Sequence, residues 1–150
     1  MSIIAIIDSR RGWQKGETVY NLAFAIFGIL GALLRYVLEW WLANPHFPQA
    51  TLLINWSGCF MLAVVSRFLI WIPKFPARLA SAIGTGFVGS FTTFSTFSLE
   101  SVQLFQRGAY CLAALYVLLS AFGGLAACLL GTRFSLFLLK RRKGGKRHAA

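Results

Sequence analysis

Long apolar runs alternate with short polar turns along this chain. Four runs, over residues 20–41, 51–72, 79–106 and 110–137, reach the roughly twenty residues that an α-helix needs to cross a bilayer at about 1.5 Å per residue. The connections are short and contain Pro or Gly, at 44–48, 73–76 and 107–108. The pattern therefore predicts an all-α integral membrane protein with four transmembrane helices, in which successive helices run antiparallel.

The two ends of the chain differ in composition from the block of residues 20–137 that contains the four runs. Residues 1–19 form an N-terminal extension that we expect to be loosely held, and its apolar run of six residues, 2–7, is too short for the core of a signal peptide. Residues 138–150 form a strongly basic C-terminal tail. The predicted organisation is an extension, one four-helix domain and a tail.

Charge is distributed very unevenly. The chain is 57% hydrophobic and carries four acidic against fifteen basic side chains, a net charge of +11. Most of the Lys and Arg residues fall on the side that would hold both termini, which predicts that this side is cytoplasmic. The tail directly follows a spanning helix, so its cations favour binding to anionic lipid headgroups over binding to nucleic acid.

Catalysis and metal binding by side chains find little support. Cys59, Cys111 and Cys128 have no metal-ligand spacing and suit packing positions. His46 lies in a Pro-flanked turn and His148 at the C-terminus, so neither is placed to activate a nucleophile. The sequence predicts a protein that is not an enzyme.

The third run is the unusual one. Residues 89–97 read GSFTTFSTF, a series of hydroxyl groups and phenyl rings with no reason to face lipid. Gly84, Gly86 and Gly89 precede Thr92, and such a cluster favours a helix that unwinds within the membrane and presents backbone groups to ions. Glycines other than Gly89 suit close helix packing; these are Gly28, Gly31, Gly58, Gly84, Gly86, Gly123 and Gly124.

Other polar residues within the runs each allow more than one interpretation. Asn55 can offer N–H donors to an anion or hydrogen-bond to another helix, and taken alone the structural use is favoured. Arg35 can reach the headgroups, add positive potential at an anion's entrance, or pair with Glu39. Glu100 suits proton coupling or a structural hydrogen bond. Phe94 and Phe97 share a helical face, so their ring edges can meet an anion or simply pack.

Three segments resemble the Fluc (CrcB) family of bacterial fluoride channels. They are GALLRY at 31–36, NWSG at 55–58 and GFVGSFTTFSTFSLE at 86–100, and the match in order and spacing covers residues from about 24 to 137. The resemblance implies a fluoride-selective channel in the bacterial inner membrane, which lowers cytoplasmic fluoride by passive, voltage-driven efflux.

The resemblance also implies an assembly and site residues. It implies an antiparallel, dual-topology homodimer with a structural Na⁺ at its centre, held by backbone carbonyls of the broken third helix, here those of Gly89 and Thr92. The implied fluoride path consists of Asn55, Phe94, Ser95, Thr96, Phe97, Tyr116 and Ser120. Arg35 and Glu100 match family positions, and their roles are left open.

Some positions depart from the family pattern. Ser90 stands where a second Gly is common, and Gly124 where a further hydroxyl can extend the polar track. The charge bias is stronger than insertion in both orientations would favour, although an antiparallel homodimer needs both. Two other functions stay open at this point: a four-helix membrane interaction subunit, and a small multidrug exporter, for which Glu39 lies too near the end of the first run.

Overall fold

The computed structural model describes residues 3–70 and 76–147, with side chains at 17–67 and 76–141, and nearly all of these residues are helical. The long helices are α1 (Ile3–Trp41), α2 (Gln49–Ile70) and α6 (Tyr110–Arg147). Each contains a stretch long and apolar enough to cross a membrane, at Glu17–Trp41, Gln49–Arg67 and Tyr110–Arg141. The predicted all-helical membrane protein is confirmed at this level.

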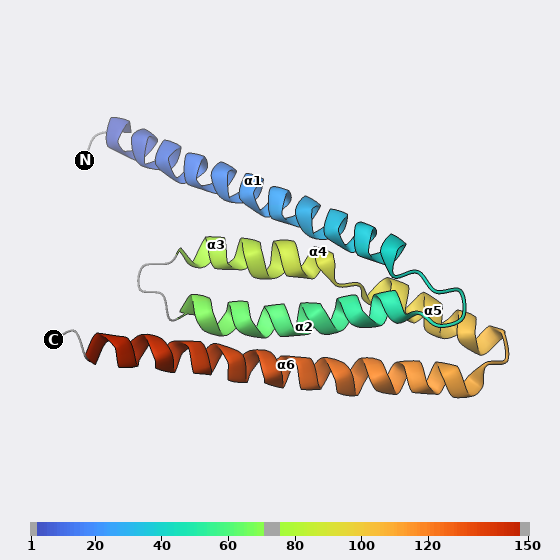
Figure 1. The fold of residues 1–150 in the computed structure, drawn as a ribbon. Coiled ribbons are helices and arrows are strands. Elements are labelled where there is room, and N and C mark those ends of the chain that lie inside the picture. The colour runs from blue at the N-terminus through green and yellow to red at the C-terminus, as the bar shows by residue number, and fades with distance from the viewer. Residues whose placement is uncertain (1–2, 71–75, 148–150) are drawn as a thin grey trace.

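The third predicted crossing is divided into shorter pieces, so it does not count as one long helix. They are α3 (Ala77–Ser81), the π-helical segment η1 (Ala82–Val88), α4 (Gly89–Phe91) and α5 (Phe94–Gln106). Together they run from one end of the bundle to the other, which makes four crossings in all (Figure 1). The predicted turn at 73–76 lies outside the described residues except for Pro76.

The first and last helices extend beyond the predicted boundaries of the four-helix domain at residues 20 and 137. α1 begins at Ile3 and runs without interruption into the first crossing, so the extension expected to be loosely held is helical from that residue onward. α6 continues through the crossing into the basic tail as far as Arg147. The start of α1 and the end of α6 lie at the same end of the bundle, as four antiparallel crossings require (Figure 1).

α2 and α6 lie side by side along most of their length (Figure 1). The Trp56 indole N–H donates to the carbonyl of Leu119 at 3.0 Å, and Phe60 packs on Phe134 with ring centroids 5.9 Å apart. Gly123 makes this contact possible, because a Cβ there would collide with the indole ring. These two continuous helices pack together beside the third crossing.

α1 packs on the other side of the third crossing, again through glycine. A Cβ at Gly31 would collide with the carbonyl oxygen of Phe87, so the two backbones meet directly. Gly86 faces the backbone of Phe24 in the same interface. The packing predicted for these glycines is confirmed.

The turn that joins α5 to α6 is closed by backbone hydrogen bonds. Gly108 has φ +75, the left-handed conformation that glycine adopts most easily. Its N–H donates to Phe105 O at 3.0 Å, and the N–H of Ala109 donates to Leu104 O at 3.0 Å, the Schellman arrangement. This turn returns the chain antiparallel to α5, alongside α2.

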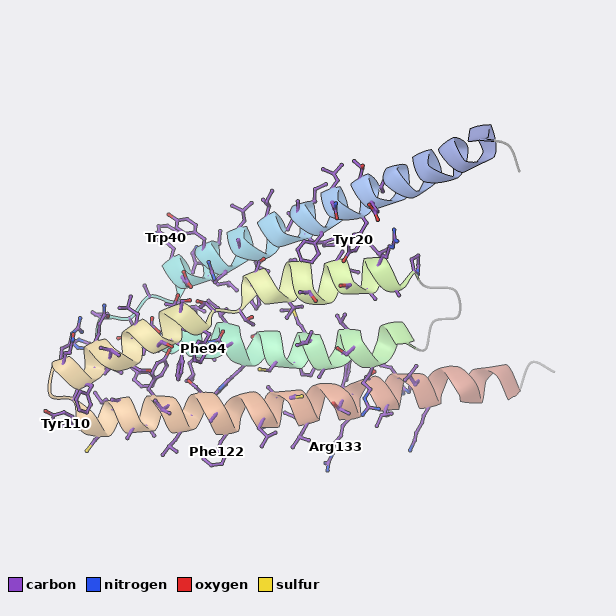
Figure 2. All side chains as sticks on the ribbon, turned by 180° about the vertical axis from the view of Figure 1, so that it is seen from behind. Tyr20, Trp40, Phe94, Tyr110, Phe122 and Arg133 are labelled. Atoms are coloured by element: carbon purple, nitrogen blue, oxygen red, sulfur yellow. The ribbon has the colours of Figure 1, made fainter. Side chains whose placement is uncertain are left out.

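Large apolar side chains cover the outside of the bundle. Trp40 is 74% exposed and Phe122 67% exposed. Figure 2 shows Phe122 pointing away from α6 on the outer face. A surface of this kind suits contact with lipid tails.

Candidate functional site

The third crossing is interrupted at Thr92 and Thr93. Thr92 has φ −81 and ψ 157, Thr93 has φ −144 and ψ 120, and both are extended, with helix on either side. Helix α4 ends with the Thr92 N–H and hydroxyl both donating to Val88 O at 3.0 Å. Helix α5 begins with the Thr93 Oγ1 accepting from the Thr96 N–H at 3.1 Å, an N-cap. The break predicted in this segment is confirmed, and hydroxyl side chains close both of its edges.

Asn55 of α2 holds the backbone at the break. Its Oδ1 accepts from the Thr93 N–H at 2.9 Å, and its Nδ2 donates to the Thr93 carbonyl at 3.0 Å. One amide side chain therefore pairs with both backbone groups of Thr93: the N–H, which the interruption leaves without a helical acceptor, and the carbonyl at the start of α5. This is the structural use of Asn55 that its sequence context favours, and one of its two Nδ2 hydrogens is left for another acceptor.

Two glycines flank the break in opposite ways. A Cβ at Gly58 of α2 would collide with the methyl group of Thr92, so Gly58 lets the interrupted backbone lie against α2. Gly89 has no neighbouring atom within 4 Å of the place where its Cβ would stand, and its φ of −65 is helical. The space beside Gly89 is therefore open in the single chain.

The interruption leaves the carbonyls at the end of α4 without their helical donors, and two of them are those of Gly89 and Thr92. In an unbroken helix Gly89 O would accept from the Thr93 N–H and Thr92 O from the Thr96 N–H. Here those two N–H groups donate to Asn55 Oδ1 and to Thr93 Oγ1 instead. Within the described residues no group of three or more His, Cys, Asp or Glu side chains could hold a metal. Hard cations bind oxygen ligands, so the freed backbone carbonyls are the groups at this place that could hold one.

Aromatic rings follow the break along α5. The Phe94 ring is 79% exposed beside the break, and its centroid lies 5.8 Å from that of Phe97. Phe97 in turn contacts Tyr116 of α6, with ring centroids 5.2 Å apart. The rings of Phe94, Phe97 and Tyr116 therefore form a row that leads from the break into the bundle, and Figure 2 labels Phe94, the first ring of the row.

Glu100 ends this row of rings. Its carboxylate accepts from the hydroxyl of Tyr116 at 2.7 Å and from that of Thr51 at 2.9 Å. Both oxygens are thus occupied, by donors from α6 and α2, and Tyr116 and Thr51 are almost wholly buried. A structural hydrogen-bonding role for Glu100, one of the two interpretations open from the sequence, is what the contacts show.

A groove of about 600 Å³ runs along the break. The predicted residues that line it are Asn55, Gly89, Thr92, Phe94, Phe97 and Ser120. The Ser120 Oγ is buried and has no hydrogen-bond partner among the described residues, so its hydroxyl is available to something in the groove. An amide, a hydroxyl and two phenyl rings converge here from α2, α5 and α6.

Other predicted residues lie elsewhere. Tyr116 lies behind Phe97 and is not part of the groove lining. The Thr96 hydroxyl accepts from Thr93 Oγ1 at 2.9 Å within the cap, and Ser95 is exposed outside the lining. Arg35 lies on α1 with its Nε 3.7 Å from Glu39 Oε1, the pairing considered from the sequence.

Sequence reasoning missed Thr51 and the part played by Thr93. In the sequence Thr51 is only the first residue of an apolar run, although a hydroxyl group at the start of such a run can indicate a polar contact. Thr93 is one member of a series of hydroxyl residues there. Its role as cap and as partner of Asn55 depends on a residue 38 positions away in the chain.

The chain is similar in sequence to a known protein family and to named bacterial proteins. It matches the family described as CrcB-like protein, Camphor Resistance (CrcB), over residues 22–132. It is 46% identical to the fluoride-specific ion channel FluC 2 of Listeria innocua, over 82% of this chain and 95% of that protein. It is 48% identical to the fluoride-specific ion channel FluC 1 of Bacillus cereus, over 77% of this chain and 87% of that protein.

Proposed function

This chain belongs to the CrcB family, and we propose that it is a fluoride-specific ion channel, as its relatives are named. The observation that carries the proposal is the groove at the broken third crossing, where Asn55, Ser120 and the two Phe rings converge. The channel lowers cytoplasmic fluoride by letting the anion leave the cell. It needs no catalytic step, in keeping with a family of channels rather than enzymes.

The driving force is the membrane potential. Fluoride enters a cell as the neutral acid and dissociates in the less acidic interior. An inside-negative potential then drives the anion outward with about 2.3 kcal/mol per charge for each 100 mV. A selective passive pore is therefore sufficient for export.

The groove replaces part of the water that a small anion must lose. The Ser120 hydroxyl has no protein partner, and Asn55 has a second amide hydrogen beyond the one bound to Thr93. Phenyl ring edges carry partial positive charge, so Phe94 and Phe97 can face an anion edge-on. Tyr116 continues the path behind Phe97. We propose that Ser95 and Thr96 supply hydroxyl groups near the entrance of the path.

A structural Na⁺ belongs to this proposal. The Gly89 and Thr92 carbonyls would hold it, because both have lost their helical donors and the space beside Gly89 is open. Bound there, the ion would neutralise backbone oxygen dipoles at the break and fix its geometry. A hard cation takes six or more oxygen ligands, so the Gly89 and Thr92 carbonyls of a second chain would add to the set.

We propose that two copies of the chain pair in antiparallel fashion in the bacterial inner membrane. Pairing of this kind would place two open Gly89 sites against each other. The cations near the termini favour one orientation, with the termini in the cytoplasm. Mapping the orientation of both ends in cells tests the homodimer directly, since a single orientation would require a different chain as partner.

Anion efflux from proteoliposomes tests the function. The purified protein is expected to discharge fluoride, and not chloride, when a potential is applied. Changing both Phe94 and Phe97 to Leu is expected to reduce fluoride efflux at least tenfold, while Phe122→Leu on the outer face leaves it unchanged. Unaltered fluoride efflux with both rings removed would overturn the proposed path. Passage of neither anion would instead indicate an interaction subunit, and proton-coupled transport of a cation would indicate an exporter.

A further inference from the structure

Two cysteine side chains lie near each other beside the groove, although they are far apart in the sequence. Cys59 belongs to α2 and lines the groove, Cys128 belongs to α6, and neither forms a disulfide. We propose that these two thiols form a binding site for a soft cation such as Cu⁺, and that a cation bound there slows the passage of fluoride. The site is inferred from the contacts alone, whereas its effect on fluoride rests on the proposed function.

The position of Cys128 is fixed by the two glycines before and after it on α6. A Cβ at Gly124 would lie 3.5 Å from the Cys59 sulfur, and a Cβ at Gly131 would lie 2.6 Å from the carbonyl oxygen of Phe60. Residues spaced by four and then by three share one face of a helix, so Cys128 lies on the face of α6 that meets α2. The thiols of Cys59 and Cys128 are close enough to interact electrostatically.

The two helices are close enough at this place for one ion to bridge them. They lie side by side, and Gly131 lets the backbone of α6 rest directly on the backbone of α2 (Figure 1). Thiolate sulfur is a ligand that selects Cu⁺, and two such ligands are sufficient for this ion. A site of this kind needs no third side chain and no short spacing in the sequence, so the spacing of the cysteines does not reveal it.

The cysteine pair continues the lining of the groove. The groove is lined on α6 by Val117, Ser120 and Ala121, and Cys128 follows Ala121 after two helical turns on the same face. Cys59 is partly buried and Cys128 is exposed in the single chain, so an ion can reach both sulfur atoms. The bound ion would therefore lie at the margin of the groove, on the side of the two chain termini.

Binding changes the charge beside the fluoride path. Two neutral thiols and one Cu⁺ give a dithiolate complex with one negative charge, and the two thiol protons are released to water. Like charges repel each other, and the repulsion is stronger in a membrane protein interior than in water. The occupied site is therefore expected to oppose the entry of fluoride into the groove from this side.

Competition for Cu⁺ tests the site without measuring conduction. The protein in detergent is titrated without oxygen against the coloured Cu⁺ complex of bicinchoninate, with ascorbate to keep the copper reduced. We expect one Cu⁺ per chain, and an affinity about tenfold or more lower in Cys59→Ser and in Cys128→Ser. Cys111→Ser is the matched control, because Cys111 is the second residue of α6, at the other end of that helix. Unchanged affinity in either Cys59→Ser or Cys128→Ser would overturn the site.

Fluoride efflux from proteoliposomes tests the effect of the bound ion. Cu⁺ added on both sides of the membrane, at a concentration that fills the site, should lower efflux about threefold or more, and a strong Cu⁺ chelator should restore it. The same addition should leave the efflux of Cys128→Ser unchanged, whereas Cys111→Ser should respond as the unaltered protein does. Full efflux with the site occupied would overturn the proposed slowing. A protein that binds Cu⁺ through both cysteines and passes no fluoride even without Cu⁺ would contradict the proposed function and still support the site.

Discussion

The α2 and α6 pair and the broken third crossing solve the same problem in different ways. α2 and α6 are continuous, so nearly all their backbone groups bond within the helix, and the helices meet through Trp56 and Gly123 (Figure 1). The third crossing stops at Thr92 and Thr93, where the backbone takes its partners from side chains. The backbone groups of α2 and α6 bond within each helix, whereas those at the break bond to side chains, one of which belongs to another helix.

The difference shows where an ion can bind. A continuous helix in a membrane has no spare backbone group in its interior. At the break, Asn55 and the Thr93 hydroxyl take up N–H groups that would otherwise bond Gly89 and Thr92, so carbonyls become available beside the groove. The two regions therefore depend on different residues, and substitutions can separate them.

The largest effect is expected from Asn55→Ala. Loss of the amide leaves the N–H of Thr93 without a partner and removes a hydrogen bond from its C=O in a partly buried place, which costs about 2 kcal/mol or more of unfolding free energy. Fluoride efflux should be lost with it. Ser57→Ala is the matched control, since the Ser57 hydroxyl donates to Leu53 O one turn back in its own helix at 2.7 Å. Thermal unfolding in detergent measures the stability of both variants. Equal unfolding midpoints for Asn55→Ala and Ser57→Ala would show that the break does not depend on Asn55.

A smaller effect is expected from Gly123→Ala, which acts on the continuous pair. The added methyl meets the Trp56 indole, and displacing that ring costs about 1–3 kcal/mol and the bond to Leu119. Gly124→Ala is its control, because a Cβ there lies at an ordinary 3.5 Å from Cys59 Sγ. Trp fluorescence and unfolding midpoints should distinguish the two variants. Equal stability would mean that α2 and α6 are less closely packed than the contacts indicate.

The smallest effect on the isolated chain is expected from Gly89→Ala. Its Cβ meets no atom within 4 Å and its backbone is helical, so unfolding free energy in sodium-free detergent should change by about 0.5 kcal/mol or less. If a cation and a second chain bind beside Gly89, sodium should stabilise the Gly89→Ala variant less than it stabilises the unaltered protein. A large loss in sodium-free detergent would show that Gly89 is needed by the single fold.

The sequence predicts the crossings well because apolar length is a strong signal. It predicts the break less closely: Gly89 is singled out, yet Gly89 is helical and the extended residues come three positions later. The reason is that Asn55 and Gly58 of α2 fix the place of the interruption, and their contacts are not visible in the local sequence.

The site follows the same rule. Phe94, Phe97 and Asn55 are recognisable because their chemistry is unusual for a membrane segment. The bond between Glu100 and Tyr116 is not, since it joins two helices across a turn, and Thr51 completes it from a third. The π-helical turn before the break likewise depends on packing against α1 through Gly31 and Gly86.

The lengths of α1 and α6 have a practical consequence. Helices of 39 and 38 residues measure about 57–59 Å, against a hydrocarbon layer of about 30 Å. Their outer turns extend beyond the hydrocarbon layer on the side of the two termini, as two separate helices, because α1 and α6 do not contact each other in the described part of the chain (Figure 1). These projecting helix ends give an antibody fragment or an electron-dense tag a place to bind, and counting the bound labels on each surface of a vesicle would reveal how the subunits are inserted.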